Sequence, residues 1–247
     1  MELITSLKNP RVQAWKSLKD RKGRRETGCF LVEGRKSVEE ALASGFEVEA
    51  VLVDADQPEL AEGVQAMLYA MPAHVLAAVC DTKTPQGIAA VMRMRYAAQT
   101  GARIIALDGV QDPGNVGTII RTADAAGFDG VLLSEQCADV FSPKVLRATM
   151  GSVFHLPLIV TNDLPAALRT MQQTGACVIS SQLDGEPFYE RTGIGERFVL
   201  VIGNEGNGVS DEVKALADKR LMLPMKGRAE SLNAAVAAGI MMYELMK

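Results

Sequence analysis

Phe198-Val-Leu-Val-Ile-Gly-Asn-Glu-Gly-Asn-Gly208 is the stretch of this 247-residue chain that decides its fold. Five consecutive apolar residues, Phe198 to Ile202, predict a strand that is buried on both faces, as in a parallel sheet covered by helices. The strand ends in a loop with three glycines, whose backbone can approach a ligand without side-chain obstruction. The pattern indicates a parallel α/β domain with a ligand site at the carboxyl ends of its strands.

Alternating strands and helices continue on both sides of this stretch. The apolar pattern predicts strands at 103–107, 130–133, 156–160, 176–180, 198–202 and 220–223. It predicts helices at 115–126, 142–150, 163–173, 210–217 and 231–246. A short polar stretch at residues 96–102 precedes the first strand, so we predict a linker there and a parallel-sheet domain at 103–247.

Residues 1–95 predict a second, smaller α/β domain, because strands and helices alternate there too. We expect helices at 9–18, 37–44 and 58–70, and strands at 29–32, 48–53, 74–76 and 91–95. Glycine commonly follows the end of a helix, so Gly23 is expected to end the first one.

Charge is distributed unevenly along the chain. The net charge is −4, yet residues 1–36 contain ten Lys or Arg and only four Asp or Glu. A basic segment on an acidic body is typical of contact with nucleic-acid phosphates, although a solvated helix face explains it equally well.

Several classes of protein are not supported by the composition. No apolar run is long enough to span a bilayer, and the N-terminus lacks the order of a signal peptide, so we expect a cytoplasmic protein. The few histidines and scattered cysteines predict neither a metal site nor disulfides; they are His74, His155, Cys29, Cys80, Cys137 and Cys177.

Three segments that follow predicted strands carry the candidate chemistry: Asn115–Arg121, Gly203–Gly208 and Leu223–Asn233. In the first, Arg121 follows Ile119 and Ile120 on a helix, and we expect it to be partly shielded from solvent. The second fits neither the dinucleotide-binding nor the P-loop pattern. The third places polar residues at the start of an apolar helix, where unpaired backbone N–H groups are available to a ligand.

In the order and content of these segments the chain resembles the SpoU/TrmH-type RNA ribose 2′-O-methyltransferases of the SPOUT superfamily. The motifs are Asn115-x-Gly-x-x-x-Arg121, Gly203-x-Glu-x-x-Gly208 and Leu223-Pro-Met-x-Gly-x-x-x-Ser-Leu-Asn233. Pro143-Lys144, Arg147, Gly151 and Phe154-His-Leu-Pro157 are also similar to the family's sequence. The first half resembles the L30e-like substrate-binding domain of these proteins, through Phe30-Leu-Val-Glu-Gly-Arg35 and Thr84-Pro-Gln-Gly-Ile88.

The resemblance implies a trefoil knot in the C-terminal domain, S-adenosylmethionine as cofactor, a homodimer and an RNA substrate, with ribosomal RNA favoured over transfer RNA. It implies cofactor contacts at Gly203, Leu223, Met225 and Leu232, with a further contact from Ser180 and Ser181. It implies a reaction site lined by Asn115, Arg121, Glu205, Ser231 and Asn233. The cations expected to contact RNA are Lys8, Arg11, Arg24, Arg25, Arg35 and Arg147.

Arg121 is always protonated, so it is a poor base and a good clamp for the phosphate beside the target ribose. Two other classes of function compete with this interpretation. One is a non-catalytic RNA-binding protein that keeps the fold, and the other is a Rossmann-type nucleotide enzyme, which the missing glycine fingerprint disfavours.

Overall fold

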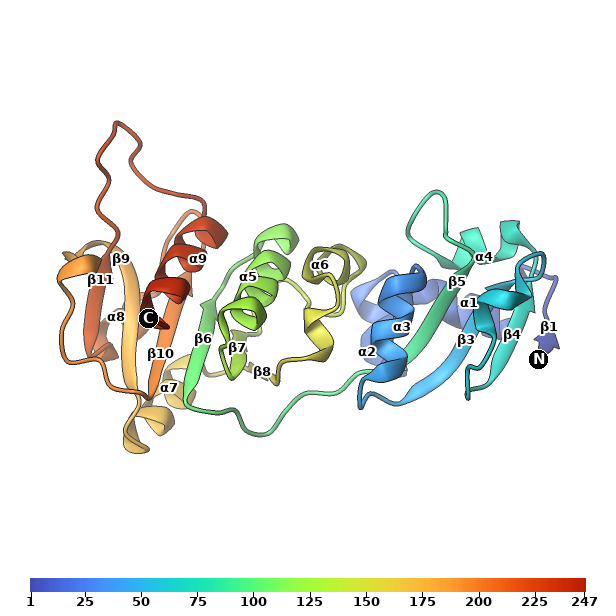
Figure 1. Cartoon of the computed structure of the whole chain (residues 1–247), viewed down its shortest axis with the longest axis horizontal. Coiled ribbons are helices and arrows are strands. Elements are labelled where there is room, and N and C mark those ends of the chain that lie inside the picture. The colour runs from blue at the N-terminus through green and yellow to red at the C-terminus, as the bar shows by residue number, and fades with distance from the viewer. The chain divides into compact units, whose positions relative to one another are not determined.

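The computed structural model describes all 247 residues, which fall into two compact units (Figure 1). The first unit contains Met1–Arg95 together with Phe141–Phe154, and the second contains Tyr96–Val140 and His155–Lys247. The first unit is therefore built from two separate stretches of sequence. No helix in either unit combines the length and apolar character that a membrane crossing requires.

The first unit is built on a five-stranded mixed sheet. The strand order is β1 (Glu2–Leu3), β4 (Leu68–Met71), β3 (Val48–Asp54), β5 (Ile88–Arg93) and β2 (Cys29–Glu33). β5 runs antiparallel to both of its neighbours, whereas β1, β4 and β3 are parallel. The helices are α1 (Pro10–Ser17), α2 (Arg21–Thr27), α3 (Arg35–Ala43), α4 (Ala73–Val79) and α6 (Pro143–Thr149), with short 3₁₀ helices η1 (Pro58–Ala61) and η2 (Ser152–Phe154).

Three expectations for the first unit were wrong. The predicted helix at 58–70 is only the 3₁₀ helix η1, and its second half is strand β4, which pairs in parallel with β3. The predicted strand at 74–76 lies inside α4. Gly23 does not end a helix but lies within α2, where a Cβ atom would come within 2.1 Å of the Ser17 carbonyl oxygen. Gly23 is therefore required for the close approach of α2 to the end of α1.

An aromatic cluster joins the two stretches of the first unit. Phe30 of β2 stacks on Phe141 with ring centroids 4.4 Å apart, and Phe46 meets Phe154 edge to face at 5.3 Å. Phe30 and Phe141 are fully buried. Burial of these large rings stabilises the packing of the Phe141–Phe154 stretch against β2.

The second unit is built on a six-stranded sheet in which every pair of neighbours is parallel. The order is β11 (Lys219–Met222), β9 (Cys177–Pro187), β10 (Phe198–Gly203), β6 (Arg103–Asp108), β7 (Gly130–Ser134) and β8 (Leu158–Thr161). The helices are α5 (Pro113–Ala126), α7 (Leu164–Gln173), α8 (Asp211–Leu216) and α9 (Ala234–Leu245), with the 3₁₀ helix η3 (Phe188–Glu190). The predicted parallel-sheet α/β fold of this half is confirmed.

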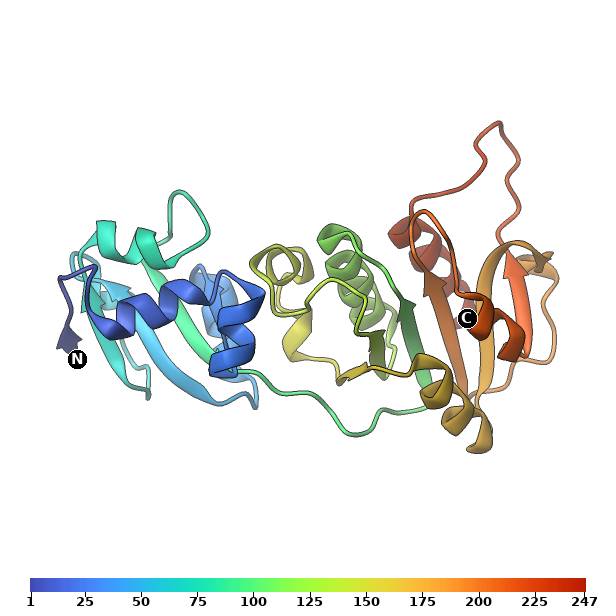
Figure 2. The same ribbon diagram turned by 180° about the vertical axis from the view of Figure 1, so that it is seen from behind.

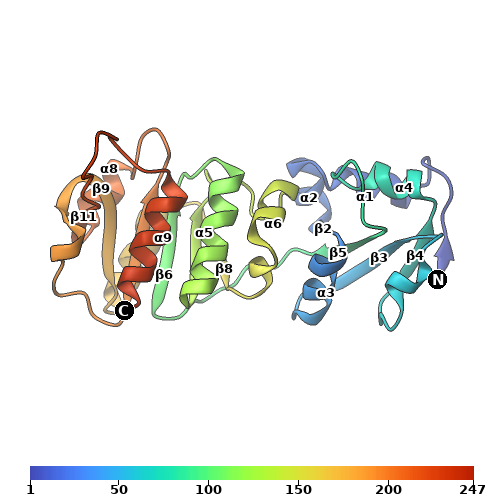
Figure 3. The same cartoon turned by 45° about the horizontal axis from the view of Figure 1, so that its top comes forward.

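Helices cover both faces of this sheet, as the continuous apolar strands predict. α5 and α9 lie side by side on one face (Figure 3), where Gly239 of α9 approaches Thr122 of α5. α7 and α8 lie on the other face (Figure 2). They supply Leu164, Leu168 and Val213 to the apolar core there. β10 pairs with β6 from Phe198 to Gly203, so the glycine loop and the loop before α5 leave the sheet next to each other.

Candidate functional site

A cavity of about 580 Å³ lies in the second unit, beside the middle of β9 and at the carboxyl ends of β10 and β11. It is lined by five of the residues predicted to bind the cofactor and by three of those predicted to line the reaction site: Ser181, Gly203, Leu223, Met225, Leu232, Glu205, Ser231 and Asn233. Its volume is typical of pockets for small molecules. Residues from the second and third motifs thus meet in one place, together with residues of β9.

The cavity exists partly because β9 is irregular. The pairing between β11 and β9 shifts register, so that Arg220 faces Ser180 and the next residue, Leu221, faces Glu186. The shift leaves Ser181 to Gly185 of β9 without partners on β11, and the first four of these residues line the cavity. Gly185 makes this possible, because a Cβ atom there would lie 2.5 Å from the Arg220 carbonyl oxygen. Sequence periodicity did not reveal this bulge, a feature that is frequent beside active sites.

The glycine loop after β10 is closed tightly on itself. Asn204 and Gly208 exchange two backbone hydrogen bonds of 2.9 Å, and Gly208 has a φ of +68°. A Cβ atom at Gly203 would lie 2.1 Å from the backbone of Gly208. The glycines at both ends of the loop are therefore needed for its shape.

Asn204 fixes the same loop through its side chain, a role that the sequence motifs do not indicate. Its Oδ1 accepts hydrogen bonds from the backbone N–H groups of Gly206 and Asn207, at 2.9 and 3.0 Å. Its Nδ2 donates to the carbonyl oxygen of Gly109 at 2.9 Å. An asparagine followed by a Gly-containing turn is the available signal, since Asn often bonds the backbone two residues on.

Glu205 ties this loop to the start of α5. Its carboxylate accepts hydrogen bonds from the backbone N–H groups of Gln111 and Asp112, both at 3.1 Å, and from Nδ2 of Asn115 at 3.0 Å. Partial burial acts to raise the pKa of Glu205, but these hydrogen bonds and one from its own backbone outweigh burial and hold the pKa below its usual value. Glu205 is therefore an ionised acceptor at neutral pH.

Asn115 and Asn233 connect the first and third motifs. Nδ2 of Asn233 donates to Oδ1 of Asn115 at 2.9 Å, and Asn115 is buried. Oδ1 of Asn233 caps α9, accepting from the backbone N–H groups of Ala235 and Val236. The side chains of Asn115 and Asn233 thus position the loops around the cavity.

Arg121 and Ser231 differ from the other reaction-site candidates because neither side chain makes a hydrogen bond or ion pair within the chain; both are exposed. Arg121 makes no hydrogen bond or ion pair within the chain, and the expectation that it is partly shielded was wrong for this single chain. Arg121 lies on α5 and does not line the cavity, and Asn115 does not line it either.

Ser210 precedes α8, but its side chain makes no capping hydrogen bond. Its backbone N–H donates instead to Oδ2 of Asp108 at 2.7 Å.

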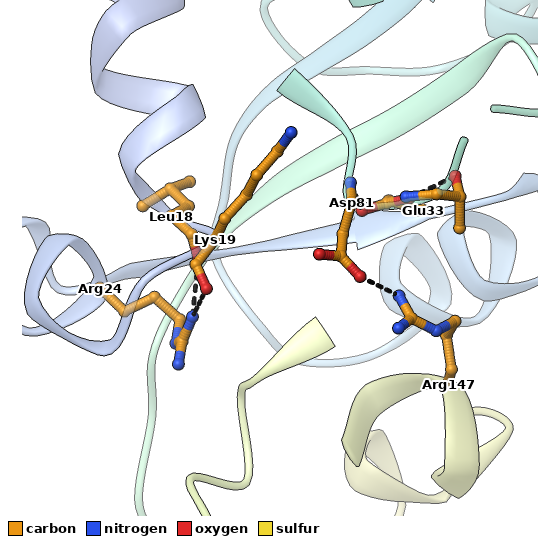
Figure 4. A network of polar contacts seen from close by, with 7 residues as sticks. Leu18, Lys19, Arg24, Glu33, Asp81 and Arg147 are labelled. Atoms are coloured by element: carbon orange, nitrogen blue, oxygen red, sulfur yellow. Dashed lines mark hydrogen bonds and ion pairs between the residues drawn. The ribbon is translucent and has the colours of Figure 1, made fainter. Parts of the chain in front are cut away.

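The cations predicted to contact RNA are placed in the first unit, where most of them are exposed. Lys8 and Arg25 are exposed, and Arg11, Arg35 and Arg147 form exposed ion pairs with Glu2, Glu39 and Asp81. Arg24 is the exception (Figure 4). It is 2% exposed and donates from Nη1 to the carbonyl oxygens of Leu18 and Lys19, so the expectation that it contacts RNA was wrong.

Figure 4 also shows how the first unit holds Arg147. Oδ2 of Asp81 accepts from Nη1 of Arg147 at 2.8 Å, and Glu33 accepts from the backbone N–H groups of Asp81 and Thr82. Arg147 therefore bonds to a loop whose backbone is fixed by the end of β2.

No group of three or more His, Cys, Asp or Glu residues is arranged to hold a metal ion.

Comparison with known families gives two matches that together cover most of the chain. A model described as the SpoU rRNA Methylase family matches residues 102–243, and one described as the MRM3-like substrate binding domain matches residues 9–90. The chain is 42% identical, over 99% of both sequences, to the 23S rRNA (guanosine(2553)-2′-O)-methyltransferase RlmP of Bacillus subtilis.

Solved structures give the same result. The AdoMet-bound rRNA methyltransferase from Sinorhizobium meliloti is 34% identical, with a TM-score of 0.88 over 98% of this chain and 96% of that one. The SpoU methyltransferase AviRb from Streptomyces viridochromogenes, in complex with AdoMet, is 29% identical, with a TM-score of 0.87 over 97% of both chains. The similarity therefore extends over both units.

Substitution of Gly203 by alanine should disrupt the glycine loop, because the new Cβ would overlap the backbone of Gly208 at 2.1 Å. We expect Gly203→Ala to lower the melting temperature by several degrees and to speed amide hydrogen exchange across residues 204–209. Gly206→Ala is the matched control, since its Cβ would meet only Oδ1 of Asn204, at 3.6 Å. Equal effects of the two substitutions would contradict this account of the loop.

The hydrogen bonds to Glu205 should stabilise the second unit in a pH-dependent manner. Because the folded-state pKa lies below the ordinary value, the stabilisation is complete above the unfolded-state pKa of about 4.3 and is lost as the pH falls through the folded-state value. Urea unfolding between pH 7 and pH 3 should show this loss in the wild type and a weaker one in Glu205→Gln. The exposed Glu196→Gln serves as control and should keep the wild-type profile.

Proposed function

Because the chain belongs to the SpoU rRNA methylase family, we propose that it transfers a methyl group from S-adenosylmethionine to a ribose 2′-hydroxyl of ribosomal RNA. The observation that carries the proposal is the single cavity in which residues of the second and third motifs meet, beside the first. The relative from Bacillus subtilis, named as a 23S rRNA 2′-O-methyltransferase, favours ribosomal RNA as the substrate class. This substrate would place the enzyme in the cytoplasm.

The residues present fit this cofactor. Leu223 and Leu232 offer apolar surface for the adenine, and Met225 lines the same wall. The backbone of Gly203 lines the cavity and is open to a ligand. Only glycine fits at this position, because the backbone of Gly208 leaves no room for a Cβ atom. When bound, the cofactor supplies an electrophilic methyl group on a sulfonium.

The task of the chain's own residues is to place the ribose oxygen in line with the methyl group and to manage its proton. We assign Arg121 to the phosphate beside the target ribose and to the charge that develops on the oxygen, because its cation has no partner within the chain. The exposed Ser231 hydroxyl, at the rim of the cavity, is assigned to the ribose. Glu205, whose oxygens accept three hydrogen bonds, is assigned to positioning rather than to proton removal.

We also propose that the chain acts as a homodimer. Val236 and Tyr243, seven residues apart on α9, are 51% and 54% exposed, and both side chains are large and apolar in character. Residues at this spacing share one face of a helix. A second copy that covers this face would also lie beside the exposed Arg121 on the neighbouring helix α5 and would complete the site.

The trefoil knot is likewise part of the proposal. After the edge strand β11 the chain returns to the middle of the sheet, where α9 packs on α5 and β10. The segment that makes this return, Leu223–Asn233, borders the cavity, so a knot at this place would tie the cofactor wall to the topology of the chain.

The test combines binding, mass and product. Isothermal titration should show binding of S-adenosylmethionine and none of NAD, and sedimentation velocity should give the mass of a dimer. Mapping of 2′-O-methylation in total RNA from cells with and without this chain should reveal one ribosomal site that depends on it. Cofactor binding without any change in methylation would contradict the proposed activity and favour a non-catalytic RNA-binding protein. Failure to bind the cofactor would also overturn the proposal.

Arg121→Lys should separate binding from catalysis. We expect S-adenosylmethionine affinity to stay within about twofold, since Arg121 does not line the cavity, while the turnover falls at least about a hundredfold. A lysine keeps the charge but loses the bidentate geometry for a phosphate. Single-turnover methylation of the mapped RNA measures the effect. Near-wild-type turnover of the variant would refute the role assigned to Arg121.

A further inference from the structure

The segment between β11 and α9 has two faces with different chemistry. Its inner residues Leu223, Met225 and Leu232 line the cavity. Its outer residues Lys226 and Arg228 are exposed and make no hydrogen bond or ion pair within the chain. Figure 1 shows this loop projecting beyond the end of β11 before it returns to α9. Around Gly227, between the two cations, a Cβ atom would meet nothing within 4 Å.

These two cations stand out against an acidic unit. The second unit contains 11 Lys or Arg and 17 Asp or Glu. The residues that line the cavity include the acids Asp184 and Glu205. Lys214 is the one cation among the lining residues, and its Nζ donates to Oδ1 of Asp211 at 3.2 Å. An RNA that approaches this cavity therefore meets a negative surface, unless cations nearby neutralise its phosphates.

We propose that Lys226 and Arg228 bind backbone phosphates of the substrate RNA beside the target ribose, and that this contact holds the loop over the cofactor. The inference rests on the proposed function and extends it to a pair of residues outside the motif positions. The loop carries one acid, Glu230, so its own net charge is +1 and attracts a polyanion.

The loop is suited to couple the two ligands because only its ends are fixed. At one end Leu223 follows β11 and is buried, and at the other Asn233 caps α9 and bonds Asn115. Between them, residues 224–232 form no helix or strand. An RNA phosphate that holds the outer face thus restrains the inner face against the cofactor. By linkage, RNA should then tighten cofactor binding by the same factor as the cofactor tightens RNA binding.

The double variant Lys226→Ala/Arg228→Ala tests the inference in the full-length protein, with ribosomal RNA from cells that lack this chain as the probe. We expect its affinity for S-adenosylmethionine alone to stay within about twofold of the wild type. We expect the KM for RNA to rise about tenfold or more, and the slope of log KM against log salt to fall by about 1 to 2, as the loss of two phosphate contacts predicts. RNA should no longer tighten cofactor binding in titration calorimetry.

Arg169→Ala/Arg197→Ala is the matched control, because it removes two exposed cations from the same unit, on α7 and at the amino end of β10. It should keep the wild-type KM and salt slope, and the charge-conserving Lys226→Arg/Arg228→Lys should retain most RNA binding. A loop variant that matches the control would overturn the inference, and so would one that loses cofactor affinity without RNA. A wild type that binds no S-adenosylmethionine would refute the proposed function instead.

Discussion

The carboxylate of Glu205 accepts three hydrogen bonds from the start of α5, and the geometry of the whole cavity depends on it. Hydrogen bonds to an ionised acceptor are the strong ones. Of the three donors only the Asn115 amide is buried, and leaving a buried donor without its partner costs about 1–3 kcal/mol. Asn115 in turn accepts a hydrogen bond from Asn233, which caps α9. Three motifs that lie about 90 and 118 residues apart along the chain are thus joined by one continuous set of polar contacts.

This network divides the polar residues of the site into two groups. Glu205, Asn115 and Asn233 are engaged with other parts of the protein, which makes them a rigid frame. Arg121 and Ser231 are exposed and remain available for RNA. In an RNA methyltransferase of this family such a division suits the chemistry, because methyl transfer to a hydroxyl depends mainly on the placement of two reactants. Groups that hold the frame and groups that hold the substrate are best kept separate.

Sequence patterns predicted those parts of the fold whose structure is set by local burial. The apolar run Phe198–Ile202 is the centre of the parallel sheet, and 103–107 is its neighbour. The patterns failed where long-range pairing overrides local preference. Residues 68–71 have helical composition but form β4, because they pair with β1 and β3. The β9 bulge depends on a register shift against β11, which no periodicity encodes.

For the site, the motifs identified the residues of the frame, but their spacing could not show that Asn115 and Asn233 bond each other. In the first unit, spacing likewise could not show that Arg24 is buried.

The membership of Phe141–Phe154 in the first unit has a consequence for how such chains can change. Phe141 and Phe154 lie inside the stretch that matches the methylase family, yet they complete the aromatic cluster around Phe30 and Phe46. An exchange of residues 1–95 between relatives would separate the rings of one cluster and bring together rings that had never been packed against each other. Substitutions at these four positions should therefore covary, and this coupling would keep the substrate-binding and methylase segments inherited together.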